Sequence, residues 1–111
     1  MEFSESLKKN RDFQRVYHKG KSYANRIFVM YVAENHSLSN RLGISVSKKI
    51  GNSVVRHRIT RLVRESYRLH EDNFRRGVDL VVIARAGAKG ISYREAESAI
   101  LHLAGLHKIL N

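Results

Sequence analysis

Apolar residues recur at helical spacing in three stretches of the chain. The first helix is predicted to begin at Asn10 as its cap, to bury Val16 and to end at Gly20. The second is predicted to follow Asn52, a good N-cap residue, with an apolar stripe of Val55, Ile59, Leu62, Val63, Ser66 and Leu69. The third is predicted to start with a capping box formed by Ser92 and Glu95. Its apolar stripe is Ala96, Ala99, Ile100, Leu103 and Leu110.

Strand patterns fill the region between the first two helices. A short strand is expected at 22–24 and a firmer one at 28–33, which is rich in β-branched and aromatic residues. Residues 41–47 alternate between apolar and small polar side chains, which is typical of a strand with one buried face. Because 35–40 is a polar turn, we predict that the strands on either side of it form an antiparallel pair.

The second half of the chain adds one strand. After a polar loop at 70–77, residues 78–84 form an almost continuous apolar run, which suits the interior of a sheet. The element order is therefore α-β-β-β-α-β-α. It predicts an α+β fold, a two-layer α/β sandwich, formed as a single domain over residues 1–111.

The second helix carries an unusual concentration of positive charge. Seven of the residues from 48 to 68 are Lys or Arg, and only Glu65 is acidic. At about 100° per residue, the side opposite the apolar stripe collects Arg56, His57, Thr60, Arg61, Arg64 and Arg68. Like charges at i and i+4 repel by roughly 0.2 to 0.5 kcal/mol per pair, so a merely solvated face would mix signs. A polyanion site is the better interpretation, and the planar fork of Arg favours phosphates.

The start of this helix adds a second feature that attracts anions. Asn52 caps the helix, Gly51 allows a tight approach before it, and Lys48 and Lys49 flank the free N–H groups of the first turn. These residues extend the predicted anion site beyond the helix itself.

The overall composition agrees with a polyanion partner. The net charge is +11, which attracts nucleic acid or an anionic membrane. No apolar run approaches the roughly 20 residues of a membrane span, and the N-terminal residues are not those of a signal peptide. The chain has no Cys, which removes disulfides and thiolate chemistry and suits a reducing compartment. We therefore expect a cytoplasmic protein.

A search for catalytic or metal-ligating residues finds no constellation. No HExxH, phosphate-binding glycine loop or nucleophile elbow occurs, and His102 and His107 are too far apart to share a helical face as i, i+4 residues do. We therefore assign no catalytic residue and no metal ligand to the protein.

The basic stretch resembles a known family. Residues 48–65, KKIGNSVVRHRITRLVRE, are similar to the Arg-Asn-Arg signature of the bacterial ribonuclease P protein component, with departures at His57 and Thr60. The likeness covers nearly the whole chain. It implies a subunit of an enzyme whose RNA, with bound Mg²⁺, removes the 5′ leader of precursor tRNA by hydrolysis. It also implies a left-handed β-α-β crossover, and a protein that is inactive alone.

The resemblance assigns roles to two groups of residues. The face toward RNA would comprise Lys48, Lys49, Gly51, Asn52, Arg56, His57, Arg58, Arg61, Arg64 and Arg68. The cleft for the single-stranded leader would comprise Phe13, Arg15, Tyr17 and Tyr31. Aromatic residues among cations suit base stacking, although core packing is the alternative for Phe13 and Tyr17. The competing class is a non-enzymatic basic ribosomal or RNA-chaperone protein; a helix-turn-helix repressor is disfavoured because the basic helix follows a strand.

Overall fold

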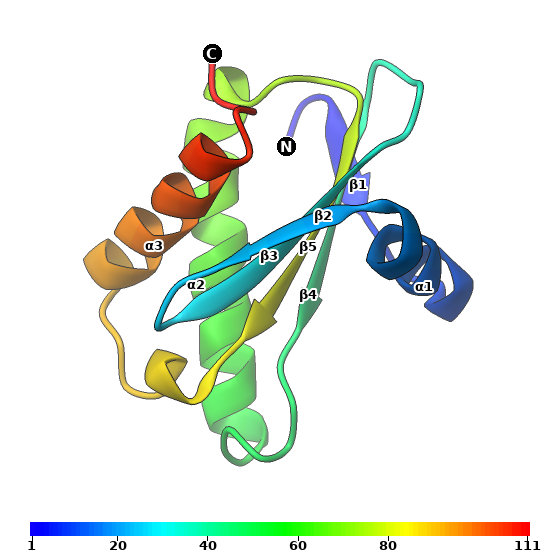
Figure 1. The fold of residues 1–111 in the computed structure, drawn as a ribbon. Helices are drawn as coiled ribbons and strands as arrows, with labels where there is room; N and C mark the ends of the chain where they lie inside the picture. Colours follow the sequence, from blue (N-terminus) through cyan, green and yellow to red (C-terminus); the bar gives the residue numbers. More distant parts are fainter.

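The computed structural model describes residues 1–111 and contains one sheet and three α-helices (Figure 1). In chain order the elements are β1 (Ser4–Ser6), α1 (Asn10–Lys19), β2 (Lys21–Ala24), β3 (Phe28–Glu34), β4 (Asn40–Ser45), α2 (Ser53–His70), β5 (Val78–Ala84) and α3 (Tyr93–Leu106), with short 3-10 helices η1 (Glu71–Asn73) and η2 (Ala86–Ala88). The predicted α+β class and the order from α1 to α3 are confirmed. Strand β1 is an addition that the hydrophobic pattern did not predict.

The five strands lie in the order β1-β4-β5-β3-β2. β4 runs parallel to both β1 and β5, and β3 runs antiparallel to β5 and β2. The predicted antiparallel pair of β3 with β4 is wrong, because β5 lies between them. β5 is buried on both faces along nearly its whole length, and burying it this way outweighs the short turn that joins β3 to β4.

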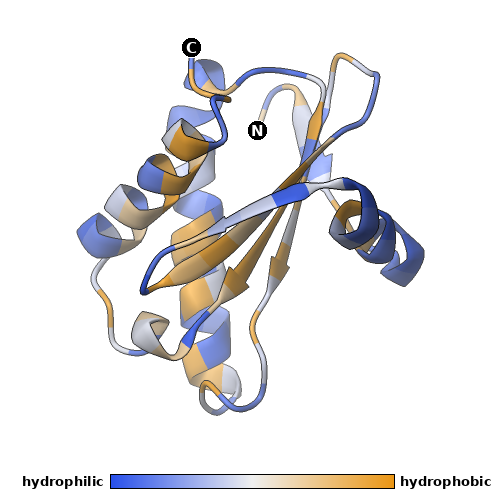
Figure 2. Cartoon of the chain, in the orientation of Figure 1, coloured by the Kyte–Doolittle hydropathy of each residue, from blue (hydrophilic) through white to orange (hydrophobic).

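Helices cover both faces of the sheet. The larger core joins α2 and α3 to one face, where Met30, Leu80 and Val82 are fully buried. The smaller core joins α1 to the other face through Val16, Ala33 and Val81. Figure 2 shows the hydrophobic surfaces of α2 and α3 turned toward the sheet, with α1 on the opposite side. The sheet with α2 and α3 forms the predicted sandwich, and α1 crosses only part of the other face.

Two of the three predicted helix starts are confirmed. Asn52 Oδ1 accepts a hydrogen bond of 3.0 Å from the backbone N–H of Val55, and Ser92 with Glu95 forms the full capping box. Asn10 is wrong as a cap: it is the first helical residue, and Lys9 precedes it without a side-chain cap. α1 does end before Gly20, and a glycine is needed there because a Cβ would lie 2.6 Å from the carbonyl oxygen of Val16.

The ends of α2 and α3 differ from the predicted stripes. Tyr67 is buried in α2, whereas Leu69 is 54% exposed. Leu110 lies beyond α3 and forms an isolated β-bridge with Phe74. The stretch predicted as a polar loop at 70–77 therefore contributes Phe74 to the core.

Strand β1 is held mainly by polar contacts. The carboxylate of Glu71 is buried and accepts hydrogen bonds from the backbone N–H groups of Glu2, at 2.7 Å, and Phe3, at 3.2 Å. The hydroxyl groups of Ser4 and Tyr67 lie 2.6 Å apart. A strand stabilised in this way leaves no hydrophobic signature in the sequence.

β4, α2 and β5 form a crossover between adjacent parallel strands. This agrees with the predicted strand, basic helix, strand unit. The left-handed sense of the crossover stays a prediction from the resemblance.

Candidate nucleic-acid interface

The exposed face of α2 carries cations without carboxylate partners. Arg58, Arg61 and Arg64 are exposed, and none lies within ion-pair distance of an acidic group. Arg56 is half-buried, and its Nε is buried without a hydrogen-bond partner. These positive charges are therefore available to an external anion, as the sequence predicts.

Arg68 differs from the other arginines of α2. Its guanidinium binds the carboxylate of Glu65, one turn earlier, and this hydrogen bond holds the pKa of Glu65 below its ordinary value. Both side chains are about half exposed. Arg68 thus lies on the predicted face, but Glu65 offsets its charge.

Position 57 lies in a shallow pocket on this face. The pocket is lined by Val54, His57, Thr60, Arg61 and Arg64. The hydroxyl of Thr60 donates a 3.0 Å hydrogen bond to the carbonyl oxygen of Arg56, so it is used within the helix. His57 is exposed and points to the same surface as the arginines.

The segment before α2 brings the remaining predicted cations to the same end. Lys48 and Lys49 are exposed in a turn between β4 and α2. A Cβ at Gly51 would lie 2.9 Å from the side chain of Val55, so the glycine permits the chain to pass close to the first turn. The predicted cations of this segment therefore lie next to the start of α2.

The three predicted cleft aromatics meet on the opposite face of the sheet. The ring centroids of Phe13 and Tyr17 lie 6.4 Å apart, and those of Tyr17 and Tyr31 lie 5.0 Å apart with nearly perpendicular planes. All three side chains are half-buried. Burial, together with the neighbouring Tyr31, raises the pKa of the Tyr17 hydroxyl, which therefore stays a hydrogen-bond donor at neutral pH.

Beside these aromatic residues, the same face of the sheet is not covered by α1. Tyr31 is in register with Ser22 on one side and Val81 on the other. The next row on the same face is exposed or half-buried and consists of Ala24, Val29, Ile83 and Ser45. We refer to Phe13, Tyr17, Tyr31 and this row as the aromatic cleft.

Arg15 has a partner within the protein. It forms an ion pair with Asp79, whose side chain is completely buried. Arg41 binds the same carboxylate in a bidentate manner, at 3.0 and 2.7 Å, and the amide of Asn35 donates to it at 2.9 Å. Arg15 therefore lies beside Asn35 and Arg41, near the β3–β4 loop, with its charge offset by Asp79.

Sequence reasoning missed this ion-pair cluster. Asp79 sits in an otherwise apolar strand, and its partners come from α1, the β3–β4 loop and β4. A single acidic residue near the start of a buried strand was the one available signal, because a buried carboxylate requires a cationic partner.

The two predicted sites open in different directions. α2 packs on one face of the sheet and α1 on the other, so the sheet separates the basic face from the aromatic cleft. The β4–α2 segment, with Lys48 and Lys49, connects them at one end (Figure 1). Such a body can contact two nucleic-acid segments at once. None of its helices has the length and apolar character needed to cross a membrane.

Comparisons with known proteins agree with this geometry. The family model described as Ribonuclease P matches residues 1–108. The ribonuclease P protein component of Lachnoclostridium phytofermentans is 60% identical over 108 residues, covering 97% of this chain and 93% of the relative. That of Alkaliphilus metalliredigens is 48% identical over the full length of both chains.

Solved structures give the same result. The Staphylococcus aureus RNase P protein superposes with a TM-score of 0.88 at 43% sequence identity, covering 96% of this chain and 97% of that one. The resemblance seen in the basic stretch is confirmed over the whole fold. The chain belongs to the ribonuclease P protein component family, whose members are subunits of an endoribonuclease ribonucleoprotein that processes tRNA.

Proposed function

We propose that this chain binds the catalytic RNA of ribonuclease P through the basic face of α2 and the 5′ leader of precursor tRNA through the aromatic cleft. The observation that carries the proposal is the separation of these surfaces by the sheet. One surface offers unpaired arginines and the other offers half-buried rings, which match a folded phosphate backbone and an unpaired strand respectively.

The basic face supports binding to a structured RNA. Arg58, Arg61 and Arg64 are exposed and free of carboxylates, so they can neutralise phosphates without first breaking an ion pair. Phosphate contacts supply affinity and orientation but do not read sequence. The protein would therefore reduce the repulsion between two crowded RNA backbones.

The aromatic cleft supports binding to a single strand. A base stacked on an aromatic side chain contributes about 1 to 3 kcal/mol and is tolerant of sequence. Tyr17 and Tyr31 stand edge to face, which leaves ring surface beside the uncovered row of the sheet. This arrangement favours an unpaired leader over a duplex.

Mg²⁺ enters this proposal as an ion held mainly by RNA and substrate. When bound there, it would activate water and stabilise charge at the phosphodiester. The residues of the chain do not fit a site of their own, because no three His, Asp or Glu side chains gather where they could hold an ion. The chain's part is to bind and orient the two RNAs, in the cytoplasm where both would be present.

The alternative class, a basic ribosomal or RNA-chaperone protein, is not favoured, because the chain belongs to the ribonuclease P protein component family. One experiment tests the proposal. Precursor tRNA is incubated with the catalytic RNA at low Mg²⁺, with and without this protein. Faster release of the leader in the presence of the protein supports the proposal, and equal rates overturn it.

A further inference from the structure

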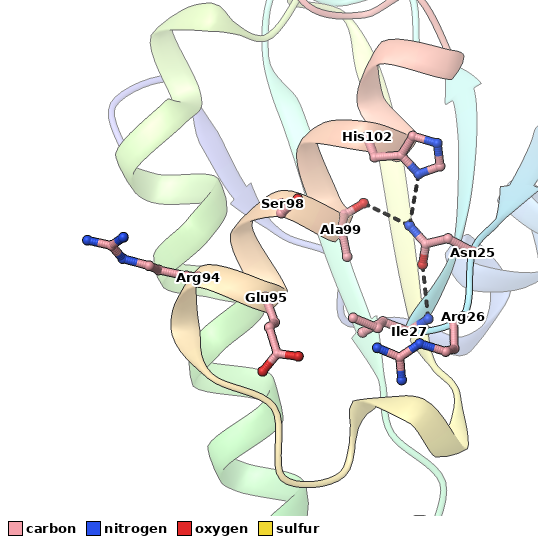
Figure 3. Close-up of a pocket in the computed structure, with 8 residues that line it drawn as sticks. All are labelled: Asn25, Arg26, Ile27, Arg94, Glu95, Ser98, Ala99 and His102. Carbon is pink, nitrogen blue, oxygen red and sulfur yellow. Dashed lines mark hydrogen bonds between the residues drawn. The ribbon is translucent and has the colours of Figure 1, made fainter.

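A second cationic pocket lies on the α3 side of the sheet, where the β2–β3 turn meets α3 (Figure 3). We call it the α3 pocket. It is lined by Asn25, Arg26, Ile27, Arg94, Glu95, Ser98, Ala99 and His102. The β2–β3 turn belongs to the edge of the sheet opposite β1, whereas α2 packs on the half that contains β4. The pocket is therefore not part of the basic face of α2.

Asn25 organises the pocket. Its Oδ1 accepts hydrogen bonds from the backbone N–H groups of Ile27, at 3.1 Å, and Phe28, at 2.9 Å. These bonds fix the orientation of the amide, so its NH₂ group must be the side that donates to the carbonyl oxygen of Ala99, at 3.1 Å. The side chain thus ties the β2–β3 turn to α3.

The same amide determines the tautomer of His102. Asn25 Nδ2 lies 3.2 Å from His102 Nδ1, and because Nδ2 is a donor, Nδ1 must accept. In the neutral imidazole the proton is then on Nε2, and Nε2 has no hydrogen-bond partner within the protein. His102 therefore offers a positioned N–H donor at an exposed place on α3.

The charged groups of the pocket are two arginines and one glutamate. Arg26 and Arg94 are exposed and form no ion pair. Figure 3 shows Arg26 and Glu95 on the same side of the pocket, with Arg94 at the outer rim and pointing away from Asn25. Glu95 is used in the capping box, where its Oε1 accepts a 3.0 Å hydrogen bond from the N–H of Ser92. The pocket keeps a net positive charge from its two arginines, and Ser98 and His102 add hydrogen-bond donors.

We propose that the α3 pocket binds a backbone phosphate of the catalytic RNA, through Arg26, Ser98 and His102, with Asn25 as the positioning residue. This rests on the proposed function. A short leader lying in the aromatic cleft occupies the other face of the sheet, but a large folded RNA can reach two edges of a body measuring 36 × 28 × 23 Å. The protein would then be held by the RNA at α2 and at α3.

Two substitutions with opposite expected effects test the proposal. Arg26→Ala removes the main cation and should weaken binding to the catalytic RNA. The slope of log K against log salt concentration should fall in magnitude by about 0.7 to 0.9. Glu95→Gln keeps the capping box, since Gln serves at this position, but removes the one negative charge. It should tighten binding several-fold. Lys108→Ala is the control for Arg26→Ala, and Asp72→Asn is the control for Glu95→Gln. Each makes the same change of charge at an exposed position outside the pocket.

The measurement is the affinity of each full-length variant for the catalytic RNA over a series of salt concentrations, with melting curves to verify folding. Arg26→Ala should lower the affinity more than Lys108→Ala does, and Glu95→Gln should raise it more than Asp72→Asn does. If each variant equals its control, the pocket proposal is overturned. The same holds if Arg26→Ala abolishes binding of inorganic pyrophosphate but leaves RNA affinity unchanged, because the pocket would then serve a small anion.

A separate readout tests the positioning role of Asn25. The ¹⁵N spectrum of the free protein should give His102 as the Nε2–H tautomer, and Asn25→Asp, which has no donor for Nδ1, should change that spectrum. An Nδ1–H tautomer in the wild type would overturn this role. If the wild-type protein fails to bind the catalytic RNA at all, the proposed function fails; if it binds and only the pocket variants equal their controls, the pocket proposal alone fails.

Discussion

The ring of Phe13 lies directly over Gly43 of β4. A Cβ at position 43 would lie 2.7 Å from Phe13 Cζ and 3.1 Å from a methyl group of Leu7. Glycine is thus required in this strand because the aromatic cleft is built on top of it. The position of Phe13 is determined as much by β4 as by its own helix.

Gly43→Ala should therefore displace Phe13. We expect a loss of stability of about 1 to 3 kcal/mol from overpacking, and weaker binding of leader-bearing tRNA than of mature tRNA. Urea denaturation and affinity measurements for both tRNAs check this. Gly105→Ala is the matched control. A Cβ at position 105 would meet no other atom within 4 Å, and the residue lies in a helix, where Ala is more favourable than Gly. Unchanged stability and leader affinity in Gly43→Ala would contradict the prediction.

Removing a ring from the cleft should affect only substrates with a leader. Phe13→Ala or Tyr17→Ala is expected to cost about 1 to 3 kcal/mol of binding to precursor tRNA for each lost stack. Both rings are half-buried, so some loss of stability is also expected. Tyr23→Ala is the control, because Tyr23 packs against His107, away from the cleft. Equal losses for precursor and mature tRNA, with a lowered melting temperature, would mean that the rings are structural.

The arginines of α2 should determine the salt dependence of RNA binding. Replacing Arg56, Arg61 and Arg64 together with Ala is expected to lower the slope by about 2, at roughly 0.7 to 0.9 for each phosphate contact. Arg68→Ala should have a smaller effect per charge, since Glu65 already offsets it. Binding measured from low to high salt gives both values. An unchanged slope in the folded triple variant would remove this face from the interface.

Acid should weaken the fold through Asp79. Burial alone raises the pKa of this carboxyl, but hydrogen bonds from Arg41 and Asn35, with the charges of Arg41 and Arg15, outweigh burial and hold the pKa below its ordinary value. A depressed folded-state pKa contributes stability above the unfolded-state value of about 3.9, and this contribution is lost as the pH falls through the folded-state value.

Asp79→Asn should accordingly lower the free energy of unfolding at pH 7 by about 3 kcal/mol, because it removes the buried carboxylate that pairs with the partly exposed guanidinium groups of Arg15 and Arg41. The variant should also lose part of the dependence of stability on pH below about 4. Urea denaturation of both proteins at pH 7 and at a series of acidic values checks this. Parallel stability curves for the two proteins would show that Asp79 is not the titrating group.

The protein without RNA should not cleave precursor tRNA. Its residues hold no activated nucleophile and form no metal site, so we expect intact substrate after incubation with Mg²⁺. Addition of the catalytic RNA to the same sample is the positive control. Cleavage that survives repurification of the RNA-free protein would refute this.

Local signals in the sequence were sufficient for the starts of α2 and α3 and for the exposure of the arginines of α2. Asn52 and the pair Ser92 and Glu95 specify helix starts through hydrogen bonds within four residues, and these predictions were correct. The arginines of α2 are placed by helical periodicity alone. Leu69 fails the same rule because the last turn of α2 buries Tyr67 instead, whose hydroxyl oxygen accepts a hydrogen bond from Asn40 Nδ2 and lies 2.6 Å from the hydroxyl of Ser4.

Contacts between distant parts of the chain were beyond prediction. The partner of Arg15 is 64 residues away, and Glu71 binds Glu2 at a separation of 69 residues. The pairing of β3 with β5 depends on which strand best fills the centre of the sheet, and a short turn between β3 and β4 gives no information about that. The role of Asn25 could not be predicted from its neighbours in the sequence, because its partner Ala99 lies in α3, 74 residues away.

The central strand of the sheet, β5, is also the last strand to leave the ribosome. A nascent chain that ends before Val78 already contains α2 with its arginines, but β3 and β4 have no strand between them to pair with. Folding of the whole sheet must therefore wait until β5 itself has been translated, as is usual where pairing is non-local. A message truncated before that point would yield a cation-rich chain in which β3 and β4 both lack their central partner.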